Sequence, residues 1–315
     1  MNLKTRYLLT CLMLFRIEIS FSANVNFLNR RLLKKWYGSK NLANMTELSL
    51  TDRHFTLVKH DSFADFANLK ELYLDSNNIH SIETRTFSDV ASLRKLFLFD
   101  NQLDSLNWLD GLRHLRELYL SGNNLTKLES NDFRDLFYLT TLDLSSNKFS
   151  RLKKATFERL IRLEKLDLSS SRIEAIEPDS FVGLKNLREL RLENNRLTSL
   201  QSNMFGALNR LKSLYLEGND MVSIELGSFN NLAHLEALFL QENELKTMGG
   251  NIFDEMANIK LVNLSDNKIE TFDFKCEIAR QFKYEVNVYL KKNAFKDGGA
   301  LKKECRAQEN VNFIF

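Results

Sequence analysis

The sequence predicts an α/β solenoid: a curved parallel β-sheet on the concave face, with irregular or short helical segments on the convex face. A pattern of apolar residues recurs every 24 residues over most of the chain, and a period of that length indicates stacked repeats. Inside each period, two Leu positions alternate as they do in a short strand with one buried side. The 315-residue chain, with 43% hydrophobic and 27% charged residues, has the composition of a folded domain.

Residues 1–22 have the pattern of a secretory signal peptide. Lys4 and Arg6 give a positive start, residues 7–15 are apolar, and residues 20–22 offer a small-residue cleavage site. The alternative is a buried N-terminal helix. The apolar run is too short to cross a bilayer, and no run long enough follows it. We therefore expect a secreted, extracellular chain without a membrane span.

Residues 23–44 lack the repeat pattern. We expect them to form an N-terminal cap, because the open edge of the first repeat would otherwise be exposed to other chains.

Residues 45–272 contain ten copies of the template LxxLxLxxNxLxxLxxxxFxxLxx. The copies begin at Met45, Leu69, Leu93, Leu115, Leu139, Leu163, Leu187, Leu211, Leu235 and Ile259. Successive starts differ by 24 residues, except that Leu93 and Leu115 differ by 22. No copy can bury its own Leu residues alone, so each needs a neighbour on both sides.

Each template position has a physical role. The fourth and sixth positions point into the core, so the fifth points outward. The Asn of the ninth position can satisfy backbone groups of adjacent turns, and it recurs as Asn77, Asn101, Asn123, Asn147, Asn195, Asn219, Asn243 and Asn267. The Phe of the nineteenth position is expected to form a buried aromatic spine of Phe63, Phe87, Phe133, Phe157, Phe181, Phe205, Phe229 and Phe253.

Three repeats depart from the template. Arg53 and Ser171 occupy the ninth position of the first and sixth repeats, so we expect the Asn column to be weaker there. The third repeat is two residues short and has Leu109 in place of Phe. A tighter convex side is therefore expected near Trp108.

Residues 273–315 are expected to form a C-terminal cap with one disulfide. A short amphipathic helix and then a strand-like alternation are indicated by Phe274, Ile278 and Phe282, and by Val286, Val288 and Leu290. Cys276 and Cys305 are an even pair that an oxidising compartment would join. A zinc site is disfavoured because no His lies near them.

The template resembles that of the leucine-rich-repeat family, and the two-Cys C-terminal end resembles secreted insect humoral members of it. The repeats are also similar to those of Toll-type receptor ectodomains. The resemblance implies a horseshoe that binds a protein partner on its concave sheet. The Cys-flanked N-terminal cap common in extracellular members is absent, because residues 23–44 contain no Cys.

The outward fifth position carries two aromatic clusters. Adjacent strands bring Tyr73, Phe97 and Tyr119 together, with Phe99 beside them, and Tyr215 and Phe239 form the second cluster. Exposed aromatic side chains on a rigid surface are typical interface anchors, so we expect these residues and Arg191 to contact a ligand. The alternative is that the rings only pair across strands. Between the clusters lies a charged stretch of Asp143, Asp167, Arg191 and Glu193. The alternative there is a solvated face on which Asp167, Arg191 and Glu189 pair with one another.

Two further surface features are indicated. Glycosylation acceptor triplets begin at Asn44, Asn124 and Asn263. Basic residues gather at both ends of the chain, where they could hold a polyanion or be solvated cap surface: Arg30, Arg31, Lys34, Lys35 and Lys40, then Lys291, Lys292, Lys296, Lys302, Lys303 and Arg306.

The sequence favours a binding protein over an enzyme. It contains no catalytic or cofactor motif, and its five His residues occupy different template positions, so no metal or cofactor is expected. A net charge of +3 disfavours a nucleic-acid partner. We expect a secreted, non-catalytic protein-binding module in innate immunity or extracellular signalling. The alternative is a matrix or adhesion component that binds through its basic ends, and a face-to-face dimer is compatible with either.

Overall fold

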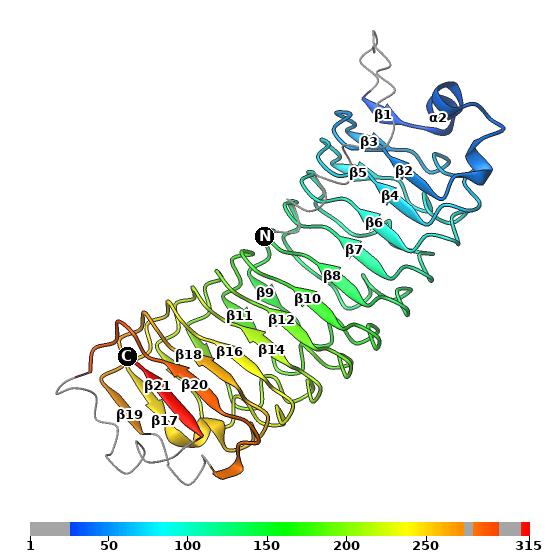
Figure 1. Cartoon of the computed structure of the whole chain (residues 1–315). Coiled ribbons are helices and arrows are strands. Elements are labelled where there is room, and N and C mark those ends of the chain that lie inside the picture. Colours follow the sequence, from blue (N-terminus) through cyan, green and yellow to red (C-terminus); the bar gives the residue numbers. More distant parts are fainter. Residues whose placement is uncertain (1–25, 274–279, 296–309) are drawn as a thin grey trace.

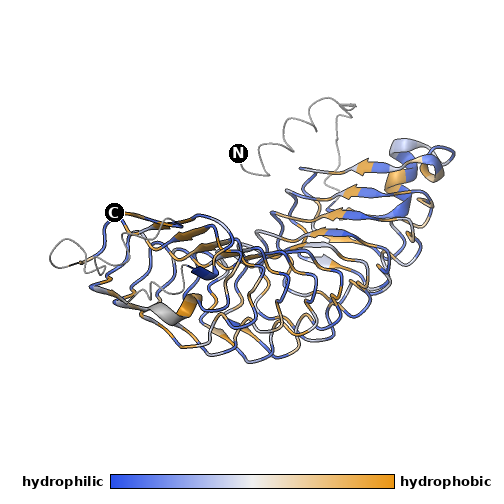
Figure 2. Ribbon diagram, turned by 60° about the horizontal axis from the view of Figure 1, so that its bottom comes forward, coloured by the Kyte–Doolittle hydropathy of each residue, from blue (hydrophilic) through white to orange (hydrophobic). Residues whose placement is uncertain are grey.

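The computed structural model describes residues 26–273, 280–295 and 310–315. The turns stack into one elongated solenoid that runs from the N-terminal to the C-terminal end (Figure 1). The stack curves into an arc, and polar and apolar segments alternate along each turn (Figure 2). The predicted fold class is confirmed.

A long parallel sheet lines the concave side. In the described part of the chain its strands are, in spatial order, β2 (Glu47–Ser49), β4 (Glu71–Tyr73), β6 (Lys95–Phe97), β7 (Glu117–Tyr119), β8 (Thr141–Asp143), β10 (Lys165–Asp167), β12 (Glu189–Arg191), β14 (Ser213–Tyr215), β16 (Ala237–Phe239), β18 (Leu261–Asn263), β20 (Val286–Tyr289) and β21 (Val311–Ile314). Equivalent template positions pair across neighbouring strands, as Leu166 does with Leu142 and Leu190. The register therefore places every fifth-position side chain in one row along the concave face.

Strands of two or three residues lie on the convex side. They are β3 (Leu57–Val58), β5 (Ser81–Ile82), β9 (Arg151–Leu152), β11 (Ala175–Ile176), β13 (Ser199–Leu200), β15 (Ser223–Ile224), β17 (Thr247–Gly249) and β19 (Thr271–Asp273). No convex strand is present among residues 83–150, which contain the shortened third repeat. A 3₁₀ segment, η2 (Gly250–Phe253), follows β17.

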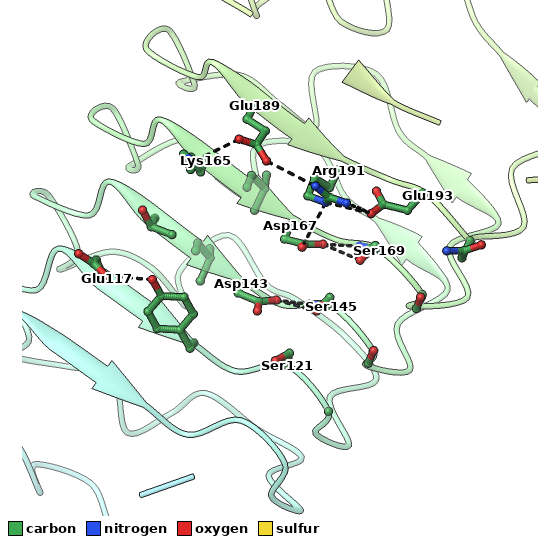
Figure 3. A pocket seen from close by; sticks show the side chains of 18 of the residues that line it. Glu117, Ser121, Asp143, Ser145, Lys165, Asp167, Ser169, Glu189, Arg191 and Glu193 are labelled. Atoms are coloured by element: carbon green, nitrogen blue, oxygen red, sulfur yellow. Dashed lines mark hydrogen bonds and ion pairs between the residues drawn. The ribbon is translucent and has the colours of Figure 1, made fainter. Parts of the chain in front are cut away.

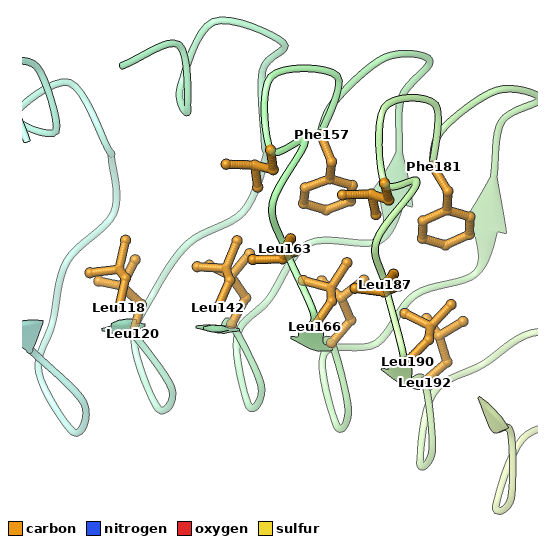
Figure 4. Packing of buried hydrophobic residues seen from close by; sticks show 14 of the residues in the cluster. Leu118, Leu120, Leu142, Phe157, Leu163, Leu166, Phe181, Leu187, Leu190 and Leu192 are labelled. Carbon is orange, nitrogen blue, oxygen red and sulfur yellow. The ribbon is translucent and has the colours of Figure 1, made fainter. Parts of the chain in front are cut away.

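The core consists of the template Leu and Phe residues. Leu163, Leu166 and their equivalents point inward from successive turns, with the Phe residues behind them (Figure 4). The Phe133–Phe157 and Phe157–Phe181 ring centroids are 5.8 and 6.3 Å apart. In the shortened repeat, Trp108 is buried and packs edge-on against Phe87 at 5.7 Å. Trp108 thus contributes an aromatic ring where the template Phe is missing.

The Asn column satisfies the backbone at each turn. Asn147 Nδ2 donates to the carbonyls of Leu144 at 2.9 Å and Leu120 at 3.0 Å, while its Oδ1 accepts from Leu125 N. Ser171 makes a longer bond, 3.3 Å, to the Leu144 carbonyl. The weaker column predicted at Ser171 is therefore present in the geometry.

The residue at the eighth position of every turn has a left-handed backbone conformation. The residues there have φ between 54° and 66°: Asp52, Ser76, Asp100, Gly122, Ser146, Ser170, Asn194, Gly218, Glu242, Asp266 and Lys292. Gly, Asn, Asp and Ser tolerate or locally support this conformation better than larger side chains do. A Cβ on Gly218 would also lie 2.5 Å from Asn194 Oδ1, so a side chain here would have to displace that of Asn194.

Residues 26–44 pack against the first repeat. Strand β1 (Phe27–Leu28) pairs with β3, and helix α2 (Arg30–Tyr37) begins where Asn29 accepts a hydrogen bond from Leu32 N. A 3₁₀ segment, η1 (Leu42–Asn44), follows. Leu28, Leu33 and Leu42 are fully buried and join the common core.

At the other end, the sheet continues past the tenth repeat. Val286, Val288 and Leu290 are buried in and after β20, in agreement with the expected alternation. Asn293 donates to the carbonyls of Leu264 and Leu290, as the template Asn residues do. A partial eleventh repeat thus lies inside the segment that we expected to be only a cap.

Several predicted features lie outside the described residues. These are the signal peptide in residues 1–22, Phe274 and Ile278 of the expected helix, and both Cys276 and Cys305.

Candidate functional site

The rings of the first aromatic cluster stack face to face. This cluster, Tyr73, Phe97 and Tyr119, is here called the N-terminal stack. The Tyr73–Phe97 and Phe97–Tyr119 centroids are 4.4 and 4.8 Å apart, with nearly parallel planes. Phe97 is only 1% exposed, so the prediction of an exposed ring is wrong for this residue. Both faces of its ring are covered by the tyrosines of the neighbouring turns. Phe99, two residues later, is half-buried.

Polar groups also brace the N-terminal stack. The hydroxyls of Tyr73 and Tyr119 donate to Glu71 and Glu117, each at 2.9 Å. Lys95 lies between these carboxylates, with Nζ–O distances of 3.5 and 3.6 Å. The alternation of Glu, Lys and Glu beside Tyr, Phe and Tyr therefore pairs the charges within the sheet itself.

The second aromatic cluster begins with an arginine and is here called the C-terminal stack: Arg191, Tyr215 and Phe239. The Tyr215 and Phe239 rings stack at 4.7 Å. The Arg191 guanidinium lies over the free face of Tyr215, 4.5 Å from its centroid. The expected neighbourhood of these two aromatic residues is present, and Arg191 extends it toward the centre of the sheet.

A hollow of about 1010 Å³ lies between the stacks, on the concave side (Figure 3). Arg191 is its main positive group. Its nitrogens lie 2.6 Å from Glu193 Oε1, 3.6 Å from Glu189 Oε1 and 3.6 Å from Asp167 Oδ2. The mutual pairing that the sequence left open is therefore present. Asp143 instead accepts from the Ser145 backbone and hydroxyl, at 2.9 and 2.7 Å.

The concave face is acidic although the chain is not. The third, fifth, seventh and eighth positions of the ten repeats hold thirteen acidic and three basic residues. The acidic ones are Glu47, Asp52, Glu71, Asp75, Asp100, Glu117, Asp143, Asp167, Glu189, Glu193, Glu217, Glu242 and Asp266, and the basic ones are Lys95, Lys165 and Arg191. The whole chain carries +3. Positive charge is thus concentrated elsewhere on the molecule.

Burial perturbs several of these carboxyl groups. It raises the pKa of Asp143, to which the neighbouring charge of Asp167 adds. It raises the pKa of Asp75 to about 6 and that of Glu217 to about 7. The pKa of Glu193 is also raised by burial, against the opposing charge of Arg191. Removal of a carboxyl from water disfavours its ionised form, so these groups hold protons more tightly than exposed ones do.

Three oxygens on consecutive turns accept no hydrogen bond in the described part of the protein. They are Glu193 Oε2, Glu217 Oε2 and Gln241 Oε1, all at the seventh template position and all buried. Sequence reasoning did not single out Glu217 or Gln241. A run of long polar side chains at a position that is Ser in four other repeats was the available signal.

The predicted glycosylation acceptors have different surroundings. Asn44 is exposed at the end of η1. Asn124 is half-buried, and its Oδ1 accepts from Lys148 Nζ at 2.6 Å. Asn263 lies in β18 on the concave sheet, beside Phe239.

Among the described residues, none of the helices has the length and apolarity needed to cross a membrane. The same residues contain no group of three or more His, Cys, Asp or Glu side chains arranged to hold a metal ion.

The repeats match the leucine-rich-repeat family model over residues 43–103, 105–149, 137–197, 161–221 and 209–269. The chain belongs to the leucine-rich-repeat family. No curated protein matches it.

Solved leucine-rich-repeat structures share the fold at low sequence identity. The Drosophila Toll–Spatzle complex in its glycosylated form matches with a TM-score of 0.65 and 20% identity, over 84% of this chain and 41% of that chain. A second structure of that complex matches with a TM-score of 0.59 and 21% identity, over 84% and 42%. The TLR13–ssRNA13 complex matches with a TM-score of 0.57 and 20% identity, over 91% and 52%. This chain therefore spans about half of the length of those proteins or less.

Proposed function

We propose that this leucine-rich-repeat protein is a secreted, non-catalytic binding module that recognises a protein ligand on its concave sheet in innate immunity or extracellular signalling. The observation that carries the proposal is the C-terminal stack beside a polar hollow of about 1010 Å³ on a rigid parallel sheet. Aromatic and arginine side chains on such a surface are the usual anchors of an interface. The solved structures support an immune or developmental role, because Toll is bound there to Spatzle.

Secretion, the disulfide and the sugars belong to the same proposal. Cleavage after residue 22 would leave Cys276 and Cys305 in an oxidising compartment, where they would close the C-terminal cap. Residues 23–44 would form the opposite cap. Intact mass of secreted protein before and after deglycosylation would test the cleavage, the disulfide and the use of Asn44, Asn124 and Asn263.

The contacts of the N-terminal helix α2 weaken the alternative of a matrix component that binds polyanions through its basic ends. Arg30 and Lys34 both pair with Asp65, at 2.6 and 3.1 Å. Hydrogen bonds from Arg30 lower the pKa of Asp65 to about 2, so this carboxylate keeps its charge at any physiological pH. Part of the basic charge that a polyanion would need is therefore already neutralised.

Site-directed photo-crosslinking would test the proposal. Benzoylphenylalanine replaces Tyr119 or Tyr215 on the concave face, and Ile161 or Val222, which are 52% and 51% exposed, as controls away from the sheet. Irradiation in the native extracellular fluid should attach one discrete protein at Tyr119 or Tyr215 and none at the controls. Equal labelling at all positions, or retention on matrix that salt releases, would favour the adhesion alternative instead.

A further inference from the structure

The unpaired oxygens of the C-terminal half are all acceptors. Glu193 Oε2, Glu217 Oε2 and Gln241 Oε1 follow one another on consecutive turns, whose strands lie about 4.8 Å apart. Glu193 is 93% buried, being only 7% exposed, and it lines the concave hollow. Since a buried acceptor without a donor is costly, this column is complementary to a group rich in N–H donors.

The chain itself shows which group such a position accepts. Arg191 lies over the Tyr215 ring at 4.5 Å and donates to Glu193 from Nε and Nη2, at 2.9 and 2.6 Å. A carboxylate and an aromatic face together thus hold one guanidinium. One turn further along, Tyr215 occupies the fifth position and its ring covers the equivalent face of Phe239, so Glu217 has a neighbouring ring but no cation at that position.

The charge of the surrounding surface favours the same class of partner. Thirteen acidic and three basic residues occupy the concave positions of the ten repeats. A field of one sign attracts oppositely charged partners and repels polyanions such as RNA. In the part of the chain that the structure describes, no three of these acids are grouped to hold a metal ion instead.

We propose that the C-terminal half of the concave face binds a basic segment of its protein partner, with an Arg or Lys side chain donating to the unpaired oxygens of Glu193 and Glu217. The inference rests on the proposed concave-face function and adds the chemistry of the ligand. Arginine fits best, because its planar fork can donate several N–H groups to carboxylate oxygens at once. Glu217 gains the donor that it lacks, and Gln241 Oε1 can accept from the same segment.

Defined peptides would test this directly. A fluorescent peptide of alternating Arg and Gly is titrated with the secreted protein, and its anisotropy is compared with that of a Glu and Gly peptide of equal length. The variants are Glu217→Gln and the double variant Glu193→Gln/Glu217→Gln, which keep the shape and remove the charge. The matched control is Glu158→Gln/Asp254→Asn, which removes two exposed acids away from the concave sheet.

The wild type and the control should bind the basic peptide with equal affinity, and added salt should weaken it. The double variant should bind roughly a hundredfold more weakly, since each hydrogen-bonded charge contributes on the order of a factor of ten. Glu217→Gln alone should give an intermediate loss, and its thermal unfolding would verify that it folds.

Two results would overturn the inference: equal binding of the basic peptide by all variants, or equal binding of the acidic peptide. A rise in unfolding temperature with Ca²⁺ alone that Glu217→Gln abolishes would also overturn it, because the carboxylates would then serve a metal. If a partner crosslinks at Tyr215 but the basic peptide does not bind, the ligand chemistry is wrong and the concave-face function stands. If no partner crosslinks on the concave face, the function itself fails.

Discussion

The two stacks on the concave sheet both contain stacked Tyr and Phe rings but differ in how completely their polar groups are paired. In the N-terminal stack, Phe97 is sandwiched between two tyrosines whose hydroxyls donate to Glu71 and Glu117. In the C-terminal stack, the rings are half-buried and the acceptor oxygen of Glu217 has no donor within the described residues. Aromatic content alone therefore does not separate a structural surface from a binding one.

The pairing of the polar groups does distinguish a structural surface from a binding surface. A surface whose donors and acceptors are already matched gains little from a partner, whereas an unmatched buried acceptor is stabilised by one. By this criterion the N-terminal stack braces the sheet, and the C-terminal stack is the better candidate for ligand contact. In the sequence, both clusters are aromatic residues at the fifth template position of neighbouring repeats. The sequence alone therefore could not distinguish a bracing cluster from a ligand-binding one.

The largest expected difference between the two stacks is the loss of stability when one of their Phe rings is removed. Phe97→Ala should lower the free energy of unfolding by about 3 kcal/mol, because it removes a fully buried ring between two others. Phe239→Ala, at a half-buried position, should lower it by about 1–2 kcal/mol. Urea unfolding midpoints of the two variants would measure the difference. Equal losses would show that the two stacks have the same structural weight.

A second prediction concerns pH and Glu217. Burial raises its pKa from 4.5 to about 7 in the folded state. Between these values the unfolded chain releases the proton while the folded chain keeps it, so this group lowers stability as pH rises through that window. Below about pH 4.5 both states are protonated, and the group has no effect.

Glu217→Gln removes this titration. The variant should match the wild type near pH 4 and exceed it by roughly 1–2 kcal/mol above pH 7, after allowance for solvent screening. Thermal unfolding across this pH range would measure it, with Glu158→Gln as an exposed control that should follow the wild type. A constant difference at every pH would point to packing rather than ionisation.

Much of this fold could be predicted from the sequence because its determinants are local and repeated. Leu166 and Phe157 are buried because they occupy template positions that are apolar in nearly every 24-residue unit. The Asn147 hydrogen bonds follow from the same spacing. Even the longer hydrogen bond at Ser171 could be predicted, because Ser replaces the template Asn in the sequence. The match between prediction and structure is therefore best where one turn resembles its neighbours.

The failures occur where neighbouring turns differ. The burial of Phe97 depends on the rings of the turns on either side, so its own outward position gave the wrong exposure. Trp108, in the shortened repeat, packs against Phe87 from a position where the template has no aromatic residue. Asn293 continues the Asn column after a longer interval than 24 residues, so the fixed period did not reach it. Such features depend on contacts between turns, which a template does not contain.

The smallest expected effect tests whether the tyrosine hydroxyls distinguish the two stacks. Tyr119→Phe removes the 2.9 Å hydrogen bond to Glu117 and should lower the free energy of unfolding by about 0.5–1.5 kcal/mol. Tyr215→Phe should leave it unchanged, because the Tyr215 hydroxyl donates no hydrogen bond to the described residues. Paired thermal unfolding curves at one pH would resolve the difference. If Tyr215→Phe were the more damaging change, the C-terminal stack would be the internally braced one, and its assignment as the ligand surface would lose its basis.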